Sequence, residues 1–203
     1  MPTRSFDIED FSVIRLSAAQ DVQVKLGGKP SVKAKGPAEA LDRLSVTVAD
    51  GTLSIAQRGR GRDEIAIKVT APVLRRASIA GSGGLSIDRV AGEAFEGSIA
   101  GSGDMDIAAI EVERARFSIA GSGNVRAAGR ADRAGACIAG SGNADLSALE
   151  SRDAHVSIAG SGNVSAHAAD AAHVSILGSG NVRILGGAQC EVSRLGSGRV
   201  NCE

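Results

Sequence analysis

Apolar and polar residues alternate along most of this chain, and from residue 75 onward the alternation repeats around a Gly-Ser-Gly motif. Apolar side chains stand two residues before each motif, and again four and six residues after its first glycine. The first of these positions holds Ile79, Ile99, Ile119, Ile138, Ile158 and Ile176, with Arg194 as the exception; the second holds Leu85, Met105, Val125, Ala144, Val164, Val182 and Val200; the third holds Ile87, Ile107, Ala127, Leu146, Ala166, Ile184 and Cys202. Apolar positions two residues apart on both sides of a glycine turn predict two strands, each with one buried face.

The motif recurs seven times at a nearly constant spacing. Its first glycines are Gly81, Gly101, Gly121, Gly140, Gly160, Gly178 and Gly196, so successive copies are 20, 20, 19, 20, 18 and 18 residues apart. A fixed period of this length is typical of stacked repeat architectures. Within each repeat a strand, a tight turn, a second strand and a return connection predict one coil, with neighbouring coils about 4.8 Å apart. We therefore expect an all-β protein, a parallel β-solenoid of about seven coils of 18–20 residues, over residues 75–203.

The corner of each coil accounts for the composition of the motif. A sharp corner favours glycine, because glycine reaches positive φ without a steric cost. Asparagine follows four of the corners, at Asn124, Asn143, Asn163 and Asn181. Stacked asparagines pass amide hydrogen bonds from one strand to the next, which predicts an asparagine ladder along the solenoid. The differences in repeat length are expected between the motifs, in a loop edge.

Residues 1–74 lack the motif and are interpreted as a β-rich N-terminal section. Alternating apolar residues predict short strands around Val13, Val22 to Leu26, Leu44 to Val48, Leu53 to Ile55, and Ile65 to Val69. Asp50-Gly51 is a strong hairpin turn signal, and a short helix is expected only between Pro37 and Leu44. All five lysines of the chain lie in this section, at Lys25, Lys29, Lys33, Lys35 and Lys68. We place a domain boundary near residue 74 and leave open whether the section continues the solenoid.

Composition excludes several classes of function. The 23 basic and 23 acidic side chains give a formal net charge of zero, so no global field favours nucleic acid or an anionic membrane. With four Phe, no Trp and no Tyr, the aromatic stacking typical of sugar and single-stranded nucleic-acid sites is almost unavailable. The chain contains no apolar run of about 18 residues, so no membrane-spanning helix is expected.

The repeated unit Ser118-Ile119-Ala120-Gly121-Ser122-Gly123-Asn124-Val125, preceded by Phe11-Ser12-Val13-Ile14 and Asp21-Val22-Gln23-Val24, resembles the head GIN domain family of putative auto-transporter adhesins. The resemblance covers most of residues 8–203. It implies a β-solenoid in a bacterial protein exported to the periplasm or cell surface. Because the N-terminus has no apolar centre, the native signal sequence is expected to be absent from this chain. The family has no agreed activity, so the resemblance implies neither a cofactor nor catalytic residues.

The three cysteines occupy different positions in the repeat. Cys137 stands in an outward column of serines, where a thiol replaces a hydroxyl of similar size. Cys190 and Cys202 lie six residues before and six residues after the first glycine of the last motif, and the alternation points both side chains inward. We hypothesise a Cys190–Cys202 disulfide that closes the last coil, with two buried free thiols as the alternative. A disulfide would favour an oxidising compartment.

Other candidate chemistry is weaker. A serine between glycines suggests a nucleophile, but a motif present seven times is better explained as a structural corner. Phosphate-binding glycine loops open a helix, whereas these glycines open a strand. Gly101-Ser102-Gly103-Asp104 approaches a calcium-binding repeat, yet the other copies lack the ordered aspartates that supply several oxygen ligands. We therefore assign no catalytic, cofactor or metal site.

Two surface clusters each have two possible interpretations. His155 and His173 occupy one column on neighbouring coils, and the same column holds the charged series Arg76, Glu96 and Arg116. We interpret this column as a solvated ladder with cross-coil ion pairs, and an adventitious metal site as the alternative. Arg58, Arg60 and Arg62 form the densest positive cluster, interpreted as a hairpin loop. The alternative role for these arginines is contact with an anionic partner, such as a phosphate-bearing envelope glycolipid.

Three functions are compatible with the sequence. The first is a non-enzymatic, exported or envelope-associated binding or scaffold module, whose partner the sequence does not identify. The second is a β-helix enzyme acting on polysaccharide, which needs clustered carboxylates; Asp106 and Asp145 are instead two coils apart. The third is a structural protein that assembles end to end. Arg194 and Arg199 oppose the third, because charges at an exposed strand edge discourage pairing.

Overall fold

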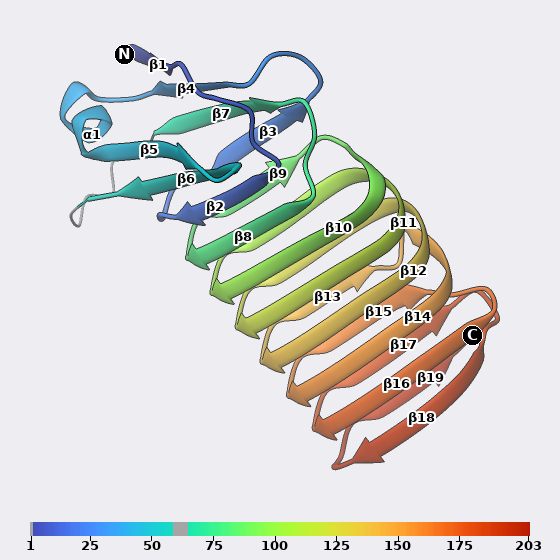
Figure 1. The fold of residues 1–203 in the computed structure, drawn as a ribbon. Helices are drawn as coiled ribbons and strands as arrows, with labels where there is room; N and C mark the ends of the chain where they lie inside the picture. The colour runs from blue at the N-terminus through green and yellow to red at the C-terminus, as the bar shows by residue number, and fades with distance from the viewer. Residues whose placement is uncertain (1, 59–64) are drawn as a thin grey trace.

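A computed structural model describes residues 2–58 and 65–203, and most of them belong to one continuous β-sheet wound into a solenoid (Figure 1). This confirms the predicted fold class. The N-terminal elements are β1 (Thr3–Phe6), β2 (Val13–Ser17), β3 (Val22–Leu26), β4 (Ser31–Lys35), α1 (Ala38–Arg43), β5 (Leu44–Ala49), β6 (Thr52–Gln57) and β7 (Ala66–Ala71). The repeats form β8 (Arg76–Gly81), β9 (Gly84–Ile87), β10 (Val90–Gly101), β11 (Asp104–Gly121), β12 (Asn124–Gly140), β13 (Asn143–Leu146), β14 (Leu149–Gly160), β15 (Asn163–His167), β16 (Ala171–Gly178), β17 (Asn181–Leu185), β18 (Gln189–Leu195) and β19 (Arg199–Cys202). In the described part of the chain, no helix is long and apolar enough to span a membrane.

Each coil contributes one strand to each of two faces. The serine face is the outward side of β6, β2, β8, β10, the second halves of β11 and β12, β14, β16 and β18. The asparagine face is the outward side of β4, β7, β3, β9, the first halves of β11 and β12, β13, β15, β17 and β19. The inward side chains of both faces form one continuous apolar core, which includes Phe95, Ile99 and Met105. The seven corners therefore bound six complete turns.

The Gly-Ser-Gly corner makes the closest contact between coils. The carbonyl oxygen of Gly101 accepts hydrogen bonds from the backbone N–H groups of Ser122 and Gly123, at 2.9 and 3.2 Å. Gly121 has a φ of +129°, and a Cβ added there would lie 2.3 Å from the Gly101 carbonyl oxygen. A Cβ at Gly123 would lie 2.3 Å from the carbonyl oxygen of Gly103. The first glycine is thus required by both its backbone conformation and the close approach, and the second by the close approach.

Differences in repeat length are absorbed in the bend opposite the corner. β11 and β12 pair in register at Ile107 with Ala127, and pair again at Ile110 with Gly129. The register shifts between these two pairs, so the shorter 19-residue repeat loses its residue there. Gly129 adopts a φ of +127° at this point. The corners and the strands beside them consequently stay aligned although the repeats differ in length.

The N-terminal section is stacked on the solenoid in an order that departs from the chain order (Figure 1). β2 and β3 pair in parallel with β8 and β9, and form a coil above the first Gly-Ser-Gly coil. On their other side β2 and β3 pair in parallel with β6 and β7. The β2–β3 coil is therefore held between strands that all follow it in the sequence. Antiparallel partners complete this end, with β5 on β6, β4 on β7 and β1 on β4.

The last coil, formed by β18 and β19, carries the predicted pair of cysteines on its inward side. Cys190 and Cys202 are joined by a disulfide, with their Cα atoms 6.7 Å apart. They stack on Ala172 and Ile184 of the preceding coil, both fully buried. The disulfide thus links the two faces at the end of the apolar core, where β18 and β19 have no further described strand beside them.

Polar side chains also hold this last coil, one from within it and one from the preceding coil. Arg194, the exception in the isoleucine column, donates to the carbonyl oxygen of Gly198 at 2.9 Å. The guanidinium of Arg183 donates to the Glu203 carboxylate at 2.8 Å and lowers the pKa of that carboxyl below its ordinary value. The stabilisation that this ion pair gives to the folded chain is fully present above the ordinary pKa of a glutamate. It is lost as the pH falls through the lowered pKa of Glu203.

The corner geometry makes a testable prediction. Gly121→Ala should lower the free energy of unfolding by at least about 2 kcal/mol, because the methyl group meets a backbone carbonyl and the backbone has positive φ. Ser122→Ala, at the exposed tip of the same corner, should change it by less than about 0.5 kcal/mol. Denaturant unfolding followed by circular dichroism measures both. Equal midpoints for the two variants would contradict the steric argument.

The terminal disulfide makes a second prediction. Replacing Cys190 and Cys202 by serine should lower stability by about 3 kcal/mol, because a short loop is no longer closed in the unfolded chain. In a stacked repeat the loss should be local. Hydrogen exchange should therefore accelerate in β18 and β19 and stay unchanged in β10. Cys137→Ser is the control, and uniform acceleration over all coils would show that the disulfide does not act on the last coil.

Candidate functional site

The outward columns of the serine face consist of small side chains in register. One column holds Ser78, Ser98, Ser118, Cys137, Ser157, Ser175 and Ser193, and the next holds Ala80, Ala100, Ala120, Ala139, Ala159, Leu177 and Leu195. Cys137 is a free, exposed thiol, as its outward position predicted. Leu177 and Leu195 leave large apolar side chains exposed on the last two coils. This face is regular from one coil to the next.

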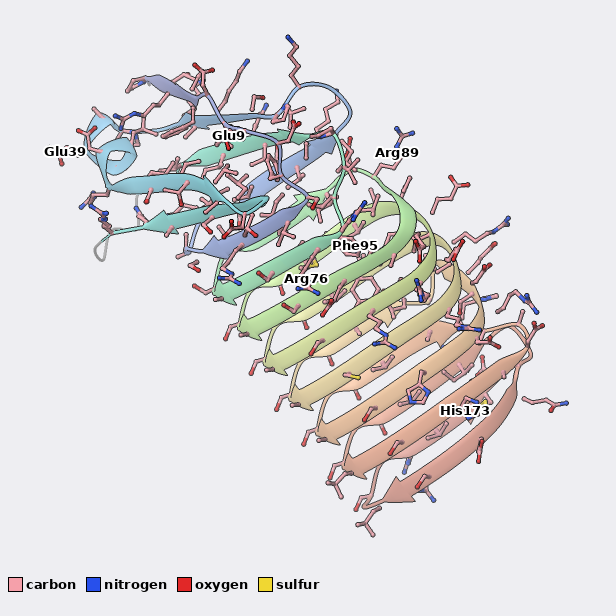
Figure 2. All side chains as sticks on the ribbon, in the orientation of Figure 1. Glu9, Glu39, Arg76, Arg89, Phe95 and His173 are labelled. Carbon is pink, nitrogen blue, oxygen red and sulfur yellow. A yellow bond between two sulfur atoms is a disulfide. The ribbon has the colours of Figure 1, made fainter. Side chains whose placement is uncertain are left out.

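The charged column beside the serines behaves as a ladder. Arg76 donates to Glu96 on the next coil at 2.7 Å. Further along, the rings of His155 and His173 lie 5.8 Å apart between centroids, and His173 Nδ1 lies 2.9 Å from a carboxylate oxygen of Glu191. Figure 2 shows Arg76 and His173 on the same face at opposite ends of the solenoid. In the described parts of the chain, no group of three or more His, Cys, Asp or Glu side chains could hold a metal ion.

The asparagine ladder runs along the opposite face. Asn124 Nδ2 donates to Asp104 at 2.8 Å, and Asn143 Nδ2 donates to Asn124 at 3.0 Å. Asn163 and then Asn181 continue the series at 2.9 and 3.0 Å. Each amide donates to the coil before it, and the first three also accept from the asparagine of the coil after them. These side chains hold neighbouring coils in register, which confirms the predicted ladder and leaves it a structural role.

A shallow depression of about 370 Å³ beside the ladder collects the carboxylates that an enzyme would need. It is lined by Asp104, Asp106 and Asp145, with Arg126 between the last two. Arg126 Nε lies 3.6 Å from Asp145, whose other carboxylate oxygen accepts hydrogen bonds from the backbone and hydroxyl of Ser147. Asp106 and Asp145 lie two coils apart, about 9.6 Å at the usual strand spacing. The arrangement is an ion-paired surface column.

Ion pairs also line the bend. Arg130 lies 3.2 Å from Glu150 and Arg152 lies 2.9 Å from Asp170, each pair joining one coil to the next. The Asp170 carboxylate raises the pKa of Arg152, first through their hydrogen bond and then through its charge. Exposed pairs of this kind contribute little to stability, because solvent screens their charges. Their role is to fix the register of the bend.

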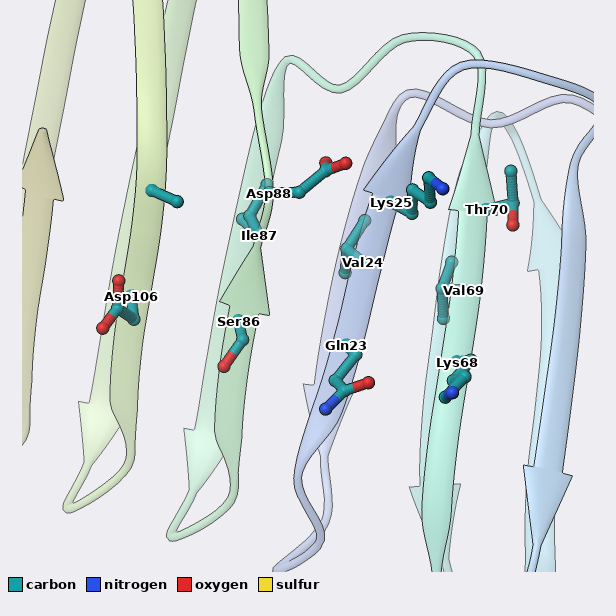
Figure 3. A pocket seen from close by; sticks show the side chains of 11 residues that line it. Gln23, Val24, Lys25, Lys68, Val69, Thr70, Ser86, Ile87, Asp88 and Asp106 are labelled. Carbon is teal, nitrogen blue, oxygen red and sulfur yellow. The ribbon is translucent and has the colours of Figure 1, made fainter. Parts of the chain in front are cut away.

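The N-terminal end of the asparagine face holds a feature that the sequence reasoning missed. A depression of about 540 Å³ is lined by Lys25 and Lys68 on the neighbouring strands β3 and β7, with Asp88 and Asp106 on its other side (Figure 3). Lys33 on β4 lies directly opposite Lys68. The sequence indicated this lysine-lined depression only by placing all five lysines between residues 25 and 68.

The predicted arginine cluster lies partly outside the described residues. Arg58 is exposed at the end of β6, and its backbone N–H donates to the carbonyl oxygen of Arg43 at 2.9 Å. Arg60 and Arg62 fall outside the described residues, so their contact with an anion stays a prediction.

Solved structures of other bacterial proteins have the same fold as this chain. The chain shares the fold of a structure described as a "putative adhesin" from Bacteroides fragilis, with a TM-score of 0.93 and 22% identity over 100% of this chain and 96% of that one. A structure described as a putative lipid binding protein from Parabacteroides distasonis gives a TM-score of 0.81 and 25% identity over 100% and 96%. A structure described as a "putative adhesin" from Parabacteroides merdae gives a TM-score of 0.78 and 18% identity over 100% and 95%. Among curated proteins, none matches this chain significantly.

The family comparison agrees with the repeat pattern. Residues 10–188 match the pattern of the family described as "Putative auto-transporter adhesin, head GIN domain". The match includes the β2–β3 coil and the first six Gly-Ser-Gly corners, and so covers most of the chain. The chain therefore belongs to the head GIN domain family of putative auto-transporter adhesins.

Proposed function

We propose that this protein is a non-enzymatic, exported binding module associated with the bacterial envelope. The observation that carries the proposal is the membership of residues 10–188 in an adhesin family, on a rigid solenoid with long regular outer faces. Such faces present repeated side chains at a fixed spacing, about 4.8 Å along the solenoid axis. A surface component with a repeating or extended structure is the partner that this geometry fits.

The disulfide supports the export part of the proposal. Disulfides form and persist in oxidising compartments and are rare in the bacterial cytosol. Cys190 and Cys202 are bonded at the end of the core, whereas Cys137 is free and exposed. The oxidation state of Cys190 and Cys202 therefore reports the compartment, and the free Cys137 serves as an internal control.

The compartment can be read from the thiols of the native protein. Cells that make the protein are lysed in denaturant with a polyethylene glycol maleimide. An exported chain should gain one adduct, on Cys137, and should gain three only after reduction, since it contains three cysteines. Cys137→Ser should then gain none without reduction. Three adducts before reduction would mean that Cys190 and Cys202 are reduced in the cell, and export would be refuted.

Binding without catalysis is tested on isolated envelopes. The purified protein should bind envelope fragments saturably, and Asp106→Asn with Asp145→Asn should leave that binding unchanged, because these carboxylates lie in an ion-paired column. The fragments should release no new reducing ends. Release of reducing ends by the unaltered protein, abolished in the double variant, would establish the polysaccharide-active enzyme in place of the binding module.

A further inference from the structure

The topology gathers lysines that are far apart in the sequence onto one end of the asparagine face. Lys33 and Lys35 lie on β4, Lys68 on β7 and Lys25 on β3, and these three strands are neighbours in the order β4, β7, β3. All four side chains are exposed. At the usual strand dimensions they cover an area of about 10 by 13 Å. We call these four residues the lysine patch.

The lysine patch contains an unfavourable contact. Lys33 and Lys68 are directly opposite each other in an antiparallel pair. Like charges in this position destabilise a sheet, whereas opposite charges stabilise it. Elsewhere the second rule is seen in Arg76 with Glu96 and in Arg130 with Glu150. Arg114 and Arg133 are also directly opposite each other, but each of these arginines has an acidic partner, Glu93 and Asp153 respectively. The lysine pair therefore reduces the stability of the fold, and a role outside the fold would explain it.

The acidic groups nearby leave the patch positive. Asp88 lies beside Lys25 in the depression, where one of its carboxylate oxygens accepts hydrogen bonds from the backbone N–H groups of Leu26 and Arg89, at 2.9 and 2.7 Å. Together with Asp106 it sets two carboxylates against the four lysines, so the patch keeps a positive surplus. Asp106 lies one strand further away, on β11. In the described part of the chain, none of the four lysines forms an ion pair. Four ammonium groups are thus available to an external anion.

We propose that the lysine patch docks the protein onto a membrane surface containing anionic phospholipid headgroups. The inference rests on the envelope association proposed above and gives that association a surface and a lipid chemistry. A lysine is a compact charge on a flexible stem, which suits mobile phosphate groups better than a fixed bidentate ligand. The patch spreads over an open sheet face and includes no aromatic side chain, which disfavours a sugar ring as the ligand. A flat anionic surface can contact all four lysines at once.

The test uses vesicle sedimentation with the unaltered protein. It should bind vesicles of phosphatidylcholine with phosphatidylglycerol, and should not bind vesicles of phosphatidylcholine alone. Lys33→Ala with Lys68→Ala should weaken binding about 30-fold, because each basic residue near an anionic surface contributes roughly fivefold. Added salt should weaken binding of the unaltered protein, because screening shortens the range of the attraction.

A matched control removes the same charge elsewhere. Arg15 and Arg199 are exposed at distant places on the solenoid, and neither forms an ion pair in the described part of the chain. Replacing both by alanine should leave vesicle binding nearly unchanged. The Lys33→Ala, Lys68→Ala variant should melt at or above the temperature of the unaltered protein, because it loses a repulsive pair. Weak vesicle binding by that variant therefore cannot be assigned to unfolding.

Three outcomes would overturn the inference. They are no binding to phosphatidylglycerol vesicles, equal losses in the lysine and arginine variants, and binding to a soluble polyanion such as polygalacturonate without binding to vesicles. Saturable binding to envelope fragments in the absence of vesicle binding would overturn the lipid docking alone and would leave the proposed function standing. Loss of both would refute both.

Discussion

The close approach of the backbone at each corner is the contact on which the rest of the solenoid depends. One glycine carbonyl accepts two N–H groups from the next corner, and a Cβ on either glycine of that corner would lie within about 2.4 Å of a backbone oxygen. Such a contact admits neither a side chain nor a shift along the strand. Because an equally close approach recurs between successive Gly-Ser-Gly corners, each coil is fixed to the previous one in a single register, and identical residues become columns.

The columns then perform different tasks according to the side on which they lie. Inward isoleucines build the core, while the asparagines of the opposite face exchange amide hydrogen bonds between coils. Charged residues of opposite sign alternate at the bend and beside the serines. The asparagines and the ion-paired residues of the repeats therefore hold neighbouring coils together. Chemistry directed at a partner is more easily found where the repeat ends, at the N-terminal section and the last coil.

The two ends of the solenoid are held in different ways. At the C-terminal end a disulfide and short polar contacts hold β18 and β19 together. At the N-terminal end the antiparallel strands β5, β4 and β1 and the helix α1 cover the stack. Covering a strand edge in this way prevents further strands from adding to it. The β2–β3 coil uses Ala18 at its corner, whose carbonyl oxygen accepts from Gly83, so the stack changes there from repeat to cap.

The sequence by itself determined the repeat, the inward columns, the asparagine ladder, the Asp50-Gly51 turn and the pairing of Cys190 with Cys202. The columns and the ladder follow from periodicity, because stacking places residues one period apart side by side. The turn follows from its own Asp-Gly residues, and the cysteine pairing from the inward position of both side chains on one coil. The insertion of β2 and β3 between later strands was decided only by the tertiary structure, since non-repeating strands carry no signal of their neighbours. The same is true of Lys33 opposite Lys68. A formal net charge of zero predicts no preference for anions. A bound anion, however, interacts mainly with the charges close to it, and only the folded sheet brings those ammonium groups together.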